Sequence, residues 1–101
     1  MKGWPVSTVE TEKRRWAILN HLNNIPGYEL NDELLKHAAR AQGIPTTHEQ
    51  IVVAIAWLEE MELVTSRQVG RTVIAGLTAS GQDVATGDRI VPGVLRPGPG
   101  A

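Results

Sequence analysis

Three histidines, at positions 21, 37 and 48, are the side chains best suited to move a proton or to bind a metal ion. They fall in three separate segments, and no His-x-x-x-His pair, acidic pair or phosphate-binding glycine loop occurs at a useful spacing. Cysteine is absent, which excludes thiolate metal sites and disulfides. His48 lies at an expected helix start, where an exposed helix-start residue is the favoured interpretation. The sequence therefore predicts no catalytic residue, no metal site, no cofactor and no small-molecule substrate, and we expect a protein that is not an enzyme.

Four polar residues suit a second kind of chemistry, contact with DNA. Thr46, Thr47, His48 and Gln50 occupy the N-terminal end of the third expected helix, the end that reaches base edges in helix-turn-helix proteins. A glutamine amide can bond the edge of adenine, and threonine hydroxyls can bond phosphates or bases. The same residues form two overlapping capping boxes, Thr46 with Glu49 and Thr47 with Gln50, so helix capping is the alternative explanation.

Arginines at two further places are suited to binding phosphate. Arg67 and Arg71 flank the turn of an expected hairpin, and Arg14 and Arg15 follow Lys13 on the first expected helix. The alternatives are protection of an edge strand by charge for the first pair and a solvated helix face for the second. Specific DNA binders make about six to ten phosphate contacts. These two pairs fall short of that number, so binding to double-stranded DNA would require a dimer.

The third expected helix has an outward face that suits protein contact better than phosphate contact. Segment 44–66 holds four glutamates and no lysine or arginine. A helical wheel places the core side at Ile51, Ala54, Ile55, Leu58 and Met61. The opposite side holds Val52, Val53 and Ala56, bordered by Trp57. Such an apolar stripe is typical of an interface, here for a partner protein, a second copy or the chain's own tail. The alternative for Trp57 is an inward orientation against the hairpin.

Helical periodicity and capping signals predict four helices. The first begins near Ser7, which forms a capping box with Glu10, and ends near Asn23. Its apolar positions are Val9, Trp16, Ile18, Leu19, Leu22 and Ile25. The second begins after the cap Asn31 and ends at Gly43. Its buried stripe is Leu34, Leu35, Ala38 and Ala39. The third follows the two threonines above, and a short last helix runs from the cap Thr78 to Gly87.

Two segments read as β-structure. "GYEL" suits a short strand, and "LVTSRQVGRTVIAGL" predicts a hairpin around Gly70 with Val73, Ala75 and Leu77 on one face. The order is therefore helix, short strand, helix, helix, hairpin, helix. This order predicts an α+β fold, mainly α with a small β-hairpin, built as a winged helix-turn-helix.

The chain has the length of one domain. We expect an N-terminal arm at 1–6, the winged-helix domain at 7–87 and a Pro/Gly-rich tail at 88–101, extended so that it can reach another subunit. No apolar run is long enough to span a bilayer and "MKGWPVSTVE" lacks the apolar stretch of a secretory signal. We therefore expect a cytoplasmic protein without membrane contact.

Several phrases resemble those of known regulators. "LEEMELVTSR" resembles the passage from third helix to wing in arsenic-repressor-like and multiple-antibiotic-resistance-like proteins, and "LTASGQDVA" resembles the phrase after their wing. Through "PGYELNDELL", "AWLEEMELVT", "LTASGQDVATG" and "VPGVLRP", roughly residues 14–97 are similar to a family of small winged-helix proteins of Mu-like prophages, often labelled arsenic-repressor-like. The resemblance implies a phage origin, in a bacterial host's cytoplasm, and a regulator-like role. It also implies an arginine near Val52 or Val53, where this chain has none.

Two hypotheses for the function follow. The first is a regulator-like module that associates with DNA as a homodimer, mainly through the phosphate backbone, using the arginines and polar residues named above. The second is a protein-interaction or phage-assembly module that binds another phage protein, or a second copy, through the outer face of the third helix.

Overall fold

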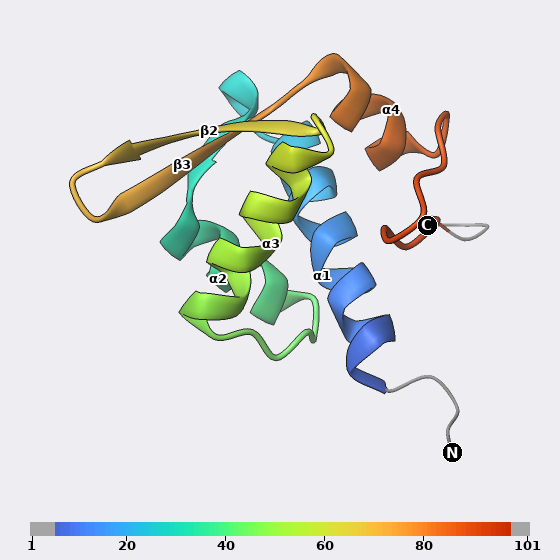
Figure 1. The fold of residues 1–101 in the computed structure, drawn as a ribbon, viewed down its shortest axis with the longest axis horizontal. Coiled ribbons are helices and arrows are strands. Elements are labelled where there is room, and N and C mark those ends of the chain that lie inside the picture. The colour runs from blue at the N-terminus through green and yellow to red at the C-terminus, as the bar shows by residue number, and fades with distance from the viewer. Residues whose placement is uncertain (1–5, 98–101) are drawn as a thin grey trace.

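The computed structural model describes residues 6–97, with side chains from Val9 onward, and has an α+β fold. Four α-helices and one three-stranded sheet make up this part of the chain (Figure 1). The elements are α1 (Val6–Asn23), the 3₁₀ turn η1 (Pro26–Tyr28), β1 (Glu29–Asn31), α2 (Asp32–Ala41), α3 (His48–Glu60), β2 (Val64–Val69), β3 (Thr72–Leu77) and α4 (Ala79–Thr86). The predicted order of helices and strands is confirmed.

The sheet is antiparallel, with strand order β1-β3-β2. The two-residue turn between Val69 and Thr72 has Gly70 at φ 61, a left-handed conformation that glycine adopts without steric cost. The hairpin of β2 and β3 projects beyond the helices (Figure 1). The short strand begins later than the "GYEL" pattern predicts, at Glu29, because Pro26–Tyr28 form η1 first.

The core lies between α1, α2, α3 and the inner face of the sheet. The predicted core side of α3 is buried at Ile51, Ala54, Ile55 and Leu58, and Ala75 of β3 is fully buried. The prediction is wrong for Met61, which is 42% exposed. Met61 lies past the last helical residue, and Glu62 adopts φ 63, so that Leu63 turns into the core in its place.

Two other residues assigned to apolar helix faces are exposed. Leu34 lies on the side of α2 that faces an open groove beside β1, and Val9 lies near the start of α1 at the edge of another groove. The predicted positions Ile18, Leu19 and Leu22 of α1 are buried, together with Ala17, which the pattern did not include.

The predicted helix caps are mostly confirmed. Asn31 accepts a 2.8 Å hydrogen bond from the Leu34 amide, and Thr78 accepts one of 3.0 Å from the Gly81 amide. Thr47 and Gln50 form a reciprocal capping box at the start of α3. The overlapping box of Thr46 with Glu49 is wrong, because the Thr46 hydroxyl donates to the Ile44 carbonyl instead. The capping box expected at Ser7 lies outside the described side chains.

The segment after α4 packs against the chain's own helices. Val91 and Val94 are each 6% exposed, and the Leu95 amide donates to the Glu12 carbonyl of α1 at 3.3 Å. The expectation of an extended tail is therefore wrong for residues 88–97, because this segment closes the core beside α1. Residues 98–101 and 1–5 lie outside the described part, and Val6 belongs to α1.

Candidate interaction surface

Arg14 is buried, contrary to its predicted place on a solvated or phosphate-binding face. Its Nε donates to Thr46 Oγ1 at 3.0 Å, and its Nη2 donates to the Pro45 carbonyl at 2.8 Å and pairs with Glu10 at 3.3 Å. Only 4% of the side chain is exposed. The guanidinium fastens α1 to the loop before α3, so Arg14 cannot contact DNA in this conformation.

Arg15 and Trp57 form a stacked pair between α1, α3 and the C-terminal segment. The guanidinium carbon lies 3.9 Å from the centre of the Trp57 ring, and Nη1 donates to the Gly93 carbonyl at 2.9 Å. Gly93 lies against the six-membered ring of the indole, where an added Cβ would be 2.7 Å from Cζ2. Burial lowers the pKa of the Arg15 guanidinium, and the charge of Glu12 opposes this shift. Trp57 therefore turns inward, but against α1 and the C-terminal segment rather than the hairpin.

The polar residues at the start of α3 are engaged within the domain. Thr46 is 4% exposed, which removes it from any DNA-facing surface. The Gln50 side chain accepts from the Thr47 amide at 2.9 Å, and the Thr47 hydroxyl accepts from the Gln50 amide at 3.1 Å. His48 Nε2 lies 2.9 Å from Oδ2 of Asp32, a buried carboxylate in the first turn of α2. Capping and pairing thus account for the residue types that the DNA hypothesis used.

The hairpin arginines differ in their surroundings. Arg67 Nη2 lies 3.1 Å from Glu29 Oε1 across the sheet, in a pair that is about half exposed on both sides. Arg71 is exposed in the turn, and no salt bridge within residues 6–97 involves it. Val69, at the end of β2, is 51% exposed. The hairpin tip therefore presents an apolar side chain beside a free cation.

The outer face of α3 is apolar between two glutamates. Val53 is 65% exposed and Ala56 is exposed beside it, whereas Val52 is half-buried and packs against the core. Glu49 and Glu60 are exposed toward the two ends of the helix. We call Glu49, Val53, Ala56 and Glu60 the α3 stripe. A shallow groove of about 210 Å³ runs beside it toward α1, lined by Thr11, Arg15, Gln50 and Val53 among others.

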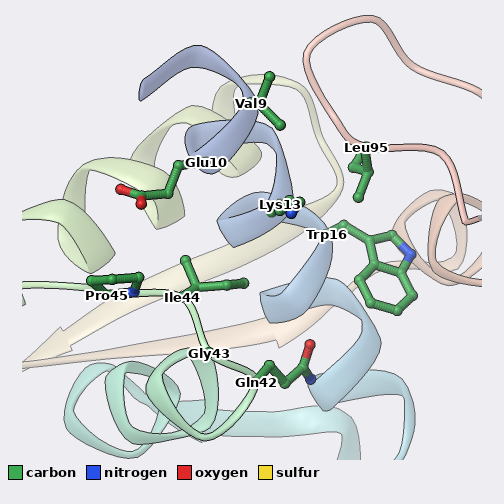
Figure 2. Close-up of a pocket in the computed structure, with 9 residues that line it drawn as sticks. All are labelled: Val9, Glu10, Lys13, Trp16, Gln42, Gly43, Ile44, Pro45 and Leu95. Carbon is green, nitrogen blue, oxygen red and sulfur yellow. The ribbon is translucent and has the colours of Figure 1, made fainter. Parts of the chain in front are cut away.

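A second groove lies on the other side of α1, at the loop between α2 and α3 (Figure 2). Its volume is about 310 Å³, and its apolar lining includes Val9, Trp16, Ile44 and Leu95. Trp16 is held there by a 3.3 Å hydrogen bond from its indole to the Ala85 carbonyl. Sequence reasoning missed this groove, although the apolar residues in "VPGVLRP" signalled that the last segment has something to pack against.

Two negative findings apply to the described part of the chain. No three His, Asp or Glu side chains gather there in a way that would hold a metal ion. No helix there is both long enough and apolar enough to cross a membrane.

Comparison with known proteins places the chain in a family. It is 35% identical over 96 residues to the "Uncharacterized protein gp26" of Escherichia phage Mu, a match that covers 95% of this chain and 99% of the phage protein. The chain belongs to the gp26 family. This match supports the phage origin that the sequence resemblance implies. No family model and no solved structure matches the chain, so the resemblance to arsenic-repressor-like regulators stays a prediction.

Proposed function

We propose that this gp26-family protein is a non-enzymatic winged-helix module that binds protein through the α3 stripe. The winged-helix assignment is supported by the succession α1, β1, α2, α3 and hairpin, with β1 added to the hairpin as a third antiparallel strand. In that plan α3 occupies the place of the helix that meets the partner molecule.

One observation carries the choice of a protein partner. Val53 is 65% exposed at the middle of α3, next to Ala56, on a helix that has no lysine or arginine. A phosphate-binding helix would present cations or hydrogen-bond donors there, and this one presents methyl groups between carboxylates. Covering a valine side chain contributes about 1–2 kcal/mol to a contact, which is enough to change an affinity about tenfold.

Val53→Asp is expected to weaken every contact made by the α3 stripe at least about tenfold, because a carboxylate would be desolvated among apolar groups. Ile90→Asp is the matched control, since Ile90 is 58% exposed but lies in the C-terminal segment. Sedimentation velocity over a range of concentrations measures self-association, and co-purification with the phage's other proteins, expressed together with it, measures binding to a different partner. If both variants behave like the unchanged protein in both measurements, the stripe is not a contact surface.

DNA association is a second candidate, favoured by the free Arg71 at the tip of a projecting hairpin. Arg67 lies four positions earlier, on β2, and would need to leave Glu29 in order to bind phosphate. The two candidate arginines of α1 add nothing to this surface, because Arg14 is buried and Arg15 is stacked on Trp57. Binding would therefore be weak in a monomer and would depend on two copies acting together.

Replacing both Arg67 and Arg71 with alanine is expected to abolish DNA binding by this route. Fluorescence anisotropy with a labelled duplex, measured between about 50 and 200 mM salt, should also show affinity falling steeply for the unchanged protein. The control replaces Arg89 and Arg96, two exposed arginines of the C-terminal segment. Absence of binding at the lowest salt, or equal loss in the control, would remove this candidate.

A further inference from the structure

The α3 stripe has a charge pattern that opposes pairing with itself. Its residues are spaced i, i+4, i+7 and i+11, which places them along one line of the helix over about 16 Å. Glu49 lies at one end of this line and Glu60 at the other. An antiparallel pair of stripes would bring Glu49 against the Glu60 of a second copy, and a parallel pair would bring each glutamate against its equivalent. Both arrangements place like charges in contact, which costs several kcal/mol across an interface.

The hairpin tip has the complementary pattern. Val69 is 51% exposed and lies between two cationic residues in the sequence, Arg67 and Arg71. No acidic residue occurs between positions 67 and 77. Arg67 is paired with Glu29, so Arg71 supplies the cation of the tip that no salt bridge within residues 6–97 engages. The tip thus offers an exposed apolar side chain with one available cation, whereas the stripe offers an apolar centre flanked by negative charge. The hairpin also projects away from the helices of its own domain, so the tip is accessible to another molecule (Figure 1).

We infer that the partner of the α3 stripe is the hairpin tip of a second copy of this chain. This inference rests on the proposed function, because it needs the stripe to be a protein contact. Val69 of one copy packs on Val53 and Ala56 of the next, and Arg71 pairs with one of the two terminal glutamates. The groove beside the stripe gives the tip room between α3 and α1.

The contact is head-to-tail, so each copy uses two different surfaces. Contacts of this kind generate rings when the rotation between copies closes and open chains when it does not. The tip is small, so a single contact is weak, and charge complementarity makes it sensitive to salt. Because Arg71 would take part in both contacts, assembly of copies and binding to DNA would compete.

Two variants, each defective in one surface, test the arrangement. Val53→Asp damages the stripe and leaves the tip intact, and Arg71→Glu damages the tip and leaves the stripe intact. Sedimentation velocity should show concentration-dependent assembly for the unchanged protein and at least a tenfold weaker association for each variant alone. An equimolar mixture of the two variants should form dimers and nothing larger, because one intact tip meets one intact stripe. Circular dichroism spectra confirm that each variant is folded, and Ile90→Asp and Arg89→Glu serve as controls that should assemble normally.

Three results would overturn the inference. The first is a mixture that stays monomeric while the unchanged protein assembles, which indicates a face-to-face contact. The second is normal assembly of Arg71→Glu. The third is an unchanged protein that is monomeric at every concentration. In the first two cases the proposed function stands if Val53→Asp still weakens assembly. In the third case, co-purification with other phage proteins decides separately whether the proposed function stands.

Discussion

Arg14→Ala is expected to lower the free energy of unfolding by about 3 kcal/mol, a large share of the stability of a small domain. The substitution removes the donors to the Pro45 carbonyl and the Thr46 hydroxyl, which sit in a buried junction between α1 and the loop before α3. It also leaves a cavity where the long side chain packs. Because α3 begins directly after this loop, the position of the α3 stripe depends on the same contacts.

Urea denaturation followed by tryptophan fluorescence measures this loss. Arg96→Ala is the control, since Arg96 is exposed in the C-terminal segment and its removal should change stability by less than about 0.5 kcal/mol. Thr46→Val removes only one of the acceptors and should cost about 1 kcal/mol. When Arg14→Ala and Thr46→Val are combined, the loss of stability should be smaller than the sum of the two single losses, because both substitutions remove the same hydrogen bond. A loss below about 1 kcal/mol for Arg14→Ala would show that the junction contributes little.

Gly81→Ala is expected to destabilise the fold by about 3 kcal/mol, through steric overlap rather than a lost contact. Gly81 is buried in the first turn of α4, where the helix rests on the backbone of Leu63. An added Cβ would overlap the Leu63 carbonyl oxygen and lie 2.8 Å from Leu77 Cδ1. The same oxygen accepts hydrogen bonds from the amide and the hydroxyl of Thr78. The methyl group must therefore push α4 away from its cap as well as from the sheet.

Gly70→Ala separates this effect from the general cost of replacing a glycine. Gly70 has φ 61 and nothing within 4 Å of an added Cβ, so alanine there meets strain but no collision. Its cost should be about 1 kcal/mol. Thermal unfolding followed by circular dichroism compares the two variants. Equal losses would mean that the close approach of α4 to Leu63 relaxes easily.

The elements were predictable because their signals are local. The capping residues Asn31, Thr47 and Thr78 act within three positions along the chain, and the spacing of Ile51, Ala54, Ile55 and Leu58 alone defines the inner side of α3. The exposure of Val53 follows from the same wheel. The hairpin follows from β-branched residues around a glycine that can adopt positive φ.

The roles of the arginines were not predictable, because their partners are distant in the sequence. Arg14 meets Thr46 across 32 positions, and Arg15 meets Gly93 across 78. Helical spacing places Arg14 on the same side of α1 as Ile18 and Leu22, but it does not indicate which later loop will cover a charged side chain there. Composition also misled at the C-terminal segment, where prolines and glycines suggested an extended tail although Val91 and Val94 belong to the core. A boundary drawn at residue 87 would cut through that core.

The stacking of Arg15 and Gly93 on Trp57 makes this indole an internal optical reporter. Trp57 follows Val53 by four positions on α3, so the two side chains are neighbours on the helix surface, and a molecule that settles on the α3 stripe comes within reach of the ring. The wavelength and the intensity of its emission should change when the C-terminal segment around Gly93 shifts, or when water beside the ring is displaced. The chain also contains Trp4 and Trp16, so replacing these two with phenylalanine leaves Trp57 as the source of the tryptophan emission. Titrations can then be followed by intrinsic fluorescence with no dye attached.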